Sequence, residues 1–355
     1  MSITELEFDA HLAEEGQAGG GAVQGRTQWQ LTWRRLRSDK VAMIALAVIV
    51  IMVLLAIFAP AFAALTHHPV DFPYPVQGEN EDGNPVGPGV NGFLLGTDST
   101  GRDLLVRILY GARISLFVGI VTTLIASVLG VAVGLIAGYF GGIIDTVLAR
   151  FTDAVLAFPY IVLALALAVV FGPSLTIILV MITFFSWAGI ARIVRGQTLS
   201  IKEKEYVEAA RSLGAGPFRI MFFDILPNLL APVLVIATLY IPTAVVFEST
   251  LSFLGLGVQP PTPSWGNMLA DAENFYQVAW WYLVFPAAAL LITTLAFNLL
   301  GDGIRDAMDP RTEKLIAARR MRRRLTGRAV RKGNKEALGG IVAGGTAADE
   351  SGKKG

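Results

Sequence analysis

Six long runs of apolar residues limit what this chain can fold into. A helix needs about 20 apolar residues to cross the hydrocarbon core of a bilayer, because every backbone N–H and C=O must bond within the segment. The predicted membrane spans are 41–65, 114–140, 150–171, 174–194, 229–256 and 278–300. Hydrophobic residues make up 54% of the 355 residues and charged residues only 16%, so we expect an all-α polytopic membrane protein.

Several classes of functional site are excluded by what the sequence lacks. It contains no cysteine, which removes disulfides, thiolate metal sites, iron–sulfur clusters and cysteine nucleophiles. No phosphate-binding loop of the form G-x-x-x-x-G-K-[ST] is present. The histidines are His11, His67 and His68, without a nearby carboxylate at ligand spacing, so we interpret them as loop residues. We therefore expect no catalytic residue, no metal site and no cofactor on this chain, and a membrane enzyme is the weakest hypothesis.

The distribution of basic residues predicts how the spans are oriented. Lys and Arg gather in 195–228 and in the tail, which carries ten of them between Arg311 and Lys332, whereas 257–277 has none. Basic loops stay in the cytoplasm, so six spans with this pattern place both termini there. The predicted first outer loop, 66–113, contains three arginines, and its acidic residues offer local pairing. These arginines are Arg102, Arg107 and Arg113.

Both ends of the chain lack an apolar period. Residues 1–40 and 303–355 are predicted to be largely disordered cytoplasmic segments. The basic cluster at 311–332 is interpreted as a solvated flank, with binding to anionic lipid headgroups as the alternative. Ala61-Phe62-Ala63 resembles a signal-peptide cleavage site, but about 40 residues precede the apolar run, so we expect 41–65 to remain a membrane span.

The polar segment between the fourth and fifth spans predicts a compact helix–turn–helix element outside the membrane. Residues 205–212 have helical propensity, and Gly214 followed by Gly216-Pro217 supplies a helix stop and a turn. A second short helix is expected from 218 to about 225, ending before Pro227, where the next span begins.

These residues resemble the EAA signature of the membrane subunits of bacterial ATP-binding-cassette (ABC) importers. The matching positions are Glu208, Ala209, Ala210, Gly214, Leu226 and Pro227, and Arg211 is assigned to the same ATPase-docking loop. Asp224 stands where the signature commonly has isoleucine. The small alanines would let a partner surface approach closely, and the charges of Glu208 and Arg211 would fix its register. In such importers this loop seats in a groove of the cytoplasmic ATPase.

Three further runs are similar to the C-type permeases of dipeptide and oligopeptide importers. They are Leu95–Asp103, Leu251–Gly257 with Pro260–Gly266, and Asn298–Asp306 with Asp309–Arg311. Together with the EAA-like segment, the resemblance covers residues 30–311. It implies the type I (MetI-like) permease fold, with a core over 114–302, in the multi-pass inner membrane of a bacterium.

The resemblance also implies partners and a substrate. These are a second homologous permease, two cytoplasmic ATPases that bind ATP and Mg, an extracytoplasmic binding protein and a peptide. No nucleic acid is expected. The alternatives are a nickel or other small-solute importer of the same branch, and a stand-alone secondary transporter or channel. The latter usually has internal repeats and several intramembrane ionisable groups, and the sequence offers no clear repeat and one such acid.

Glycines recur every fourth residue in the second span, at Gly130, Gly134, Gly138 and Gly142. Where lipid supplies no hydrophobic drive between helices, such spacing lets another helix backbone approach closely. We therefore interpret these four glycines as a helix-packing stripe.

Glu248 is the acid that lies well inside an apolar run. A carboxylate at membrane depth should face the bundle, a partner subunit or a water-filled path. It could bind a peptide's ammonium group or pair with an arginine of a neighbouring helix, and both hypotheses remain open. Trp265, Trp280 and Trp281 are interpreted as anchors at the membrane–water interface rather than as a stacking surface for substrate.

Overall fold

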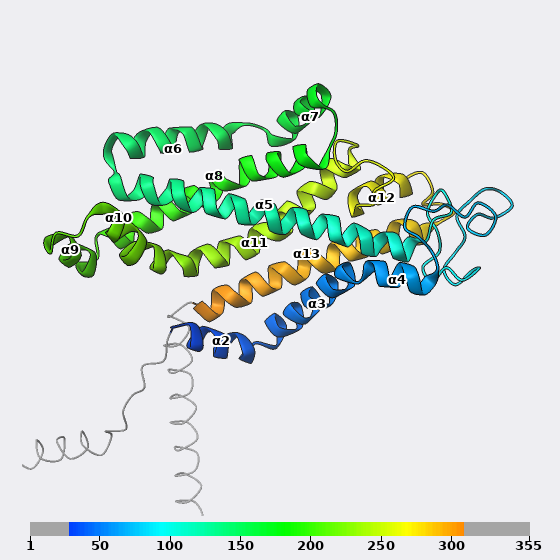
Figure 1. The fold of residues 1–355 in the computed structure, drawn as a ribbon, viewed down its shortest axis with the longest axis horizontal. Coiled ribbons are helices and arrows are strands. Elements are labelled where there is room, and N and C mark those ends of the chain that lie inside the picture. Colours follow the sequence, from blue (N-terminus) through cyan, green and yellow to red (C-terminus); the bar gives the residue numbers. More distant parts are fainter. Residues whose placement is uncertain (1–27, 309–355) are drawn as a thin grey trace, which may run out of the picture.

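Residues 28–308 are described by a computed structural model, in which they form an elongated helical bundle (Figure 1). The predicted basic cluster at 311–332 lies outside these residues. The elements are α2 Gln28–Ser38, α3 Lys40–Ile57, α4 Ala59–Thr66, α5 Leu104–Phe140, α6 Gly142–Ala157, α7 Tyr160–Phe171, α8 Leu175–Lys202, α9 Glu205–Ser212, α10 Pro217–Arg219, the π-helix η1 Ile220–Ile225, α11 Leu226–Phe253, α12 Trp265–Ala272 and α13 Trp280–Met308.

Five helices among the described residues are long and apolar enough to cross a membrane, and a bent pair supplies a sixth crossing if it counts as one span. The five are α3, α5, α8, α11 with the turns before it, and α13. The predicted single span 150–171 is wrong as one helix, because α6 and α7 meet at an angle of 77°. Pro159 causes the break: it disfavours helical geometry at Phe158, whose backbone is extended at φ −76° and ψ 132°.

Several helices are longer than the apolar runs that predicted them. The predicted outer loop 66–113 ends at Asp103, whose side chain caps α5 by accepting from Val106 N at 3.1 Å. Arg107, whose charge favoured a loop, is buried inside α5. Likewise α8 continues through Lys202, so the predicted loop 195–228 begins at Glu203.

Two predicted disordered segments contain helix. Residues 28–38 form α2, and α13 runs on through Met308 into the predicted tail. Leu36 of α2 packs against Ala42 of α3 and Ala307 of α13. This contact brings the two described ends of the chain together. We call the end that carries α9 the α9 end and the opposite end, with α4, α12 and the loop 67–103, the α12 end (Figure 1).

The centre of the bundle is the pair α5 and α8. A Cβ atom added to Gly130, Gly134 or Gly138 would lie between 2.5 and 2.7 Å from an atom of α8, so the absence of side chains there permits the close approach. The stripe ends at Gly138. Gly142 is a correction to the prediction: it begins α6 after the turn at the end of α5, has a φ of +55°, and has open space around its Cα.

Candidate functional site

A glycine turn ends α9. The N–H of Gly214 donates to the carbonyl of Arg211, and the N–H of Ala215 donates to the carbonyl of Ala210, both at 3.0 Å. This pair of bonds is a Schellman motif, which needs a left-handed residue after the helix, and Gly214 has a φ of +84°. Glycine adopts this conformation without a steric penalty, so the residue type fixes where α9 stops.

The predicted short helix that ends before Pro227 is wrong. Residues 217–253 form one continuous helical segment, because η1 joins α10 to α11 without a break. Pro227 lacks an N–H and lies at the junction of the π-helix and the α-helix. One residue later, the Asn228 side chain donates at 2.7 Å to the exposed backbone carbonyl of Asp224. A push on α10 or η1 is therefore carried directly into the membrane helix α11.

One side of this segment is anchored in the bundle. Val207, Ile220 and Ile225 are fully buried in a cluster with residues of α8 and α11. Ala210 and Leu226, both predicted docking residues, are half-buried and pack against the same cluster.

The other side is exposed and partly apolar. Leu213 is 89% exposed, Phe218 73% and Phe223 76%. The predicted residues Glu208, Ala209, Arg211, Gly214 and Pro227 are exposed as well. We define the docking face as Glu208, Ala209, Arg211, Leu213, Phe218 and Phe223. Large exposed apolar side chains on an element anchored from behind are typical of a protein interaction site.

Two ion pairs near the α9 end tie the bent pair to α8. Arg195 of α8 donates to Asp145 of α6 through two nitrogens, from Nε to Oδ1 and from Nη2 to Oδ2, the second at 2.7 Å. Arg192 pairs with Asp153, also at 2.7 Å. These pairs join residues 39 and 50 positions apart, a separation at which local sequence patterns indicate no contact.

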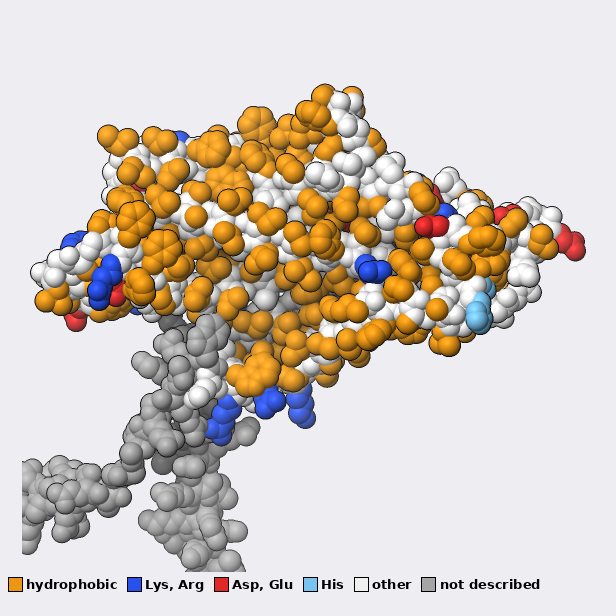
Figure 2. Space-filling view, viewed as in Figure 1, with side chains coloured by type: hydrophobic (Ala, Val, Ile, Leu, Met, Phe, Trp, Pro, Cys, Tyr) orange, Lys and Arg blue, Asp and Glu red, His pale blue; other side chains and the backbone are white. Residues whose placement is uncertain are grey.

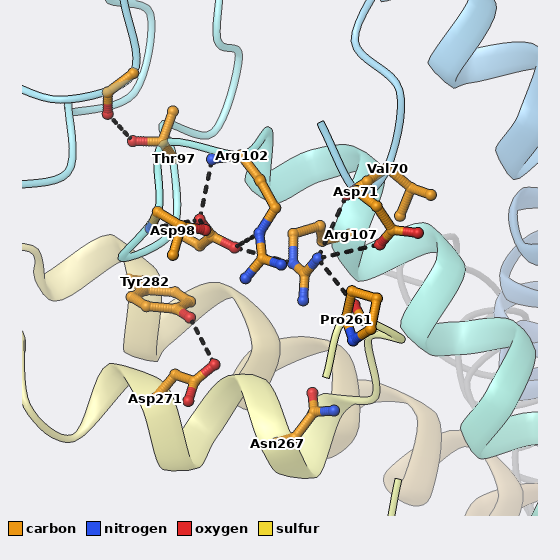
Figure 3. Close-up of polar contacts among 12 residues, drawn as sticks. Val70, Asp71, Thr97, Asp98, Arg102, Arg107, Pro261, Asn267, Asp271 and Tyr282 are labelled. Atoms are coloured by element: carbon orange, nitrogen blue, oxygen red, sulfur yellow. Dashed lines mark hydrogen bonds and ion pairs between the residues drawn. The ribbon is translucent and has the colours of Figure 1, made fainter. Parts of the chain in front are cut away.

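At the α12 end, Asp98 is the centre of a buried polar network (Figure 3). Its carboxylate is fully buried and accepts from the backbone N–H groups of Thr100 and Arg102, at 2.9 and 3.0 Å. The Nε of Arg102 donates to it at 2.7 Å, and Nε of Arg107 lies 3.0 Å away. A buried carboxylate needs this number of donors and positive charges to offset the loss of hydration.

Arg107 connects the network to three segments of the chain. Its guanidinium is 2% exposed, donates to the carbonyls of Val70 and Pro261 at 3.3 Å, and lies 3.7 Å from Asp71 (Figure 3). The predicted local pairing of the loop arginines is therefore found for Arg102 and Arg107. Arg113 instead lies over the ring of Tyr110, 5.5 Å from its centroid.

Two further acids extend this end of the molecule. Asp103, while capping α5, also contacts His68 at 2.6 Å between Oδ2 and Nδ1, so this histidine has a carboxylate partner 35 residues away. Asp271 lies 3.5 Å from the hydroxyl of Tyr282 (Figure 3). Burial and the neighbouring Asp98 raise the pKa of Asp271, and Arg107 and Arg102 oppose that shift. Among residues 28–308 no group of three or more His, Asp or Glu is arranged to hold a metal ion.

Glu248 is enclosed by hydroxyl groups. It is fully buried, and Ser115 of α5 donates to it at 2.6 Å while Ser252 donates at 2.8 Å. Ser252 in turn accepts from Val258 N at 3.2 Å, which orients its proton toward the carboxylate. The neighbouring-helix partner is thus a serine rather than an arginine. Glu248 joins α5, α11 and the loop after α11.

The tryptophans are not equivalent. Trp265 is fully buried, and its Nε1 donates to the carbonyl of Ile108 at 3.1 Å, so its interpretation as an interface anchor is wrong. It fits against Gly111, where a Cβ would lie 3.2 Å from the indole Cδ1. Trp280 is 56% exposed.

Two known protein families match separate parts of the chain. Residues 130–314 match the family described as "Binding-protein-dependent transport system inner membrane component". Residues 27–82 match the "N-terminal TM domain of oligopeptide transport permease C". Similar solved structures include an inward-facing conformation of the MetNI methionine ABC transporter, with 22% identity over 57% of this chain and 96% of that chain and a TM-score of 0.47.

Curated relatives cover nearly the whole described region. The dipeptide transport system permease DppC of Alkalihalophilus pseudofirmus is 40% identical over 80% of this chain and 90% of its own. The oligopeptide permease OppC of Escherichia coli K12 is 42% identical over 81% and 93%, respectively. The glutathione permease GsiD of Pectobacterium atrosepticum is 39% identical over 81% and 92%. The chain therefore belongs to the family of binding-protein-dependent transport system inner membrane components, as an ABC importer permease of the peptide-type branch.

Proposed function

We propose that this chain is one of two permease subunits that form the path of an ATP-driven importer for dipeptides or oligopeptides. The observation that carries the proposal is the docking face, which is exposed and anchored from behind, and whose residues Phe218 and Phe223 lie on the helical segment that continues into α11. The names of the relatives support peptides as the substrate class. The glutathione permease is nearly as similar, and glutathione is itself a small peptide-like compound, so it is the second candidate substrate.

In this proposal the α9 end faces the cytoplasm. Two partner ATPases bind ATP and Mg, and their closure presses on the docking face. The continuous helix 217–253 carries that movement through the membrane to Glu248, which accepts from Ser115 of α5 and, through Ser252, is linked to the loop after α11. The two permeases then rock about a central cavity, and a binding protein delivers the peptide at the α12 end. The coupling is reciprocal, so the state of the membrane helices alters ATPase closure.

Reconstitution tests the class of transporter. We reconstitute this chain, a second permease, the two ATPases and the binding protein in proteoliposomes. We expect uptake of labelled peptide only when ATP is present on the side of the membrane where the ATPases bind. The chain reconstituted alone should move nothing. Peptide flux through the chain without ATPases would overturn the proposal in favour of a stand-alone transporter or channel.

Two glycines of the docking segment give a matched test of coupling. Gly214→Val should reduce uptake by about tenfold, because a non-glycine residue in the left-handed region costs about 1–2 kcal/mol and the Schellman turn must reshape. Gly216→Ala, two residues away, should leave uptake unchanged, since Gly216 has a φ of −73° and open space around it. Equal uptake in both variants, with equal membrane insertion, would contradict the docking role.

A further inference from the structure

The helix α2 has two distinct faces. Leu36 is 7% exposed and packs against Ala42 and Ala307, which fixes α2 to α3 and α13. Trp33 is 48% exposed, and Arg34 and Arg37 are exposed on the side away from the bundle. At 100° per residue these three side chains fall within one third of the helix circumference, and the centre of that arc is about 110° from Leu36.

Two of the three basic side chains of α2, Arg35 and Arg37, make contacts within the chain. The guanidinium of Arg37 lies over the indole ring of Trp33, 5.3 Å from its centroid. Arg35 donates through Nη1 to the carbonyl of Ala307 at 3.3 Å, in the last turn of α13. Attraction of a cation to the carbonyl end of a helix stabilises this position for α2. The exposed arginines therefore project from a fixed helix rather than from a free chain end.

The exposed face of α2 carries uncompensated positive charge within the described residues. The helix has no acidic residue. Asp39, which follows it, uses its carboxylate to accept from Val41 N and Ala42 N and so caps α3. Among residues 28–308, neither Arg34 nor Lys40 forms an ion pair, and the contact of Arg37 is with Trp33. The helix α13, which packs against α2, carries Asp302 and Asp306 near its C-terminal end, and neither forms an ion pair with these basic side chains.

This charge lies where lipid headgroups would be. One residue separates α2 from α3, a helix apolar enough to span a membrane. Figure 2 shows Lys and Arg side chains over α2, along the edge of the extended apolar surface. Tryptophan favours the membrane–water interface, and basic residues beside it are attracted to anionic lipids.

We propose that Trp33, Arg34, Arg37 and Lys40 form a binding site for the headgroups of anionic phospholipids in the leaflet at this end of the bundle. The phosphate of the lipid would lie between the guanidinium groups, and the Trp33 ring would lie among the glycerol and upper acyl carbons. The apolar partner Trp33 and the direct continuation into a span favour a lipid over a free phosphate or an acidic protein. The site is independent of which substrate the importer carries.

The test compares lipids retained by the purified full-length chain assembled with its partner permease. Native mass spectrometry after mixing with equal amounts of phosphatidylglycerol and phosphatidylcholine should show preferential retention of phosphatidylglycerol. The variant R34Q/R37Q removes two basic side chains and should lower that preference by about 25-fold, since each basic side chain near an anionic surface contributes about a fivefold gain in binding. R34K/R37K, which keeps both charges, should retain most of it.

Arg113 supplies the matched control, because it also stacks on an aromatic ring but lies at the α12 end of the molecule. R113Q should leave the lipid preference unchanged. Raising the salt concentration should weaken the preference of the unmodified chain, which keeps the proposal testable if R34Q/R37Q fails to fold. Equal preference in the unmodified chain and R34Q/R37Q, an equal loss in R113Q, or displacement of the lipid by inorganic phosphate alone would overturn the proposal.

Discussion

The two ends of the bundle differ in which side chains they bury: one buries charged side chains, and the other leaves apolar side chains exposed. At the α12 end, Asp98 and Arg107 are buried and bonded to several segments of the same chain. At the α9 end, Leu213, Phe218 and Phe223 are left exposed on a segment whose other side is buried. The first arrangement holds the loop 67–103 to the helices. The second leaves apolar surface that another protein can cover.

This difference separates two kinds of charged residue in one membrane protein. Asp98 and Arg107 act within the chain, where removal of either leaves the other buried with one ionic partner fewer. Glu208 and Arg211 are exposed and contribute little to the stability of the isolated chain. We therefore expect substitutions at the α12 end to change stability first, and substitutions at the α9 end to change assembly and coupling first.

The largest effect is expected for Arg107→Ala. Loss of the guanidinium leaves Asp98 without one of its cations and two carbonyls without their donor, which should lower the free energy of unfolding by about 3–5 kcal/mol. Thermal unfolding of the purified chain in detergent measures the change. The control Arg113→Ala should cost about 0–1 kcal/mol, because its side chain is exposed. Equal melting of the two variants would remove the distinction between the buried network and an ordinary surface arginine.

A smaller loss is expected for Glu248→Gln. The amide keeps one acceptor oxygen, so at least one of Ser115 and Ser252 must lose its acceptor, at a cost of about 1–3 kcal/mol. Ser249→Ala should cost less, since that hydroxyl is 3.4 Å from the carboxylate. Peptide uptake kinetics separate the two hypotheses for Glu248: a raised KM with unchanged stability would place the carboxylate in contact with substrate.

Asp271 should give a modest pH-dependent effect. Its pKa is raised mainly by burial, so the folded chain binds the proton more readily than the unfolded chain does. As pH falls from neutrality through the raised pKa toward the usual aspartate value, the unmodified chain should gain stability relative to Asp271→Asn. Above that window the difference should stay constant. Denaturation of both forms from pH 4 to pH 8 measures it, and a difference that grows as pH rises would contradict the sign.

The smallest effect on stability is expected at the docking face. Phe223→Ser removes a 76% exposed ring and should change the free energy of unfolding by about 0.5 kcal/mol or less. It should nevertheless weaken binding of the partner ATPases, measured by co-purification or by substrate-stimulated ATP hydrolysis. Val76→Ser, at a 90% exposed position in the loop 67–103, is the control and should leave ATPase binding intact. A large loss of stability in Phe223→Ser would show that this ring packs within the chain.

Local chemistry explains which predictions were accurate. Gly214 lies in the predicted turn because a left-handed residue is needed there, and glycine adopts it freely. The X-Pro rule could also have found the break between α6 and α7, since Pro159 follows Phe158 inside the apolar run. In contrast, Arg107 lies in the predicted outer loop 66–113, and only its contacts with distant segments show that it is buried inside a helix. Trp265 was assigned to the interface because its sequence neighbours do not reveal the contact with Ile108, 157 residues away.

The sequence by itself determined the location of five membrane-crossing helices, the position of the turn after α9 and the family, because hydropathy, glycine, proline and short motifs act through nearby residues. Only the tertiary structure decided how the charges are used. Ser115 reaches Glu248 across 133 residues, and Arg107 reaches Pro261 across 154. It also decided that Pro227 lies within a continuous helical segment, which follows the π-helix η1 and is held against the bundle by the buried Ile225. Contacts between distant segments set burial, and burial decides whether a charge binds within the chain or faces a partner.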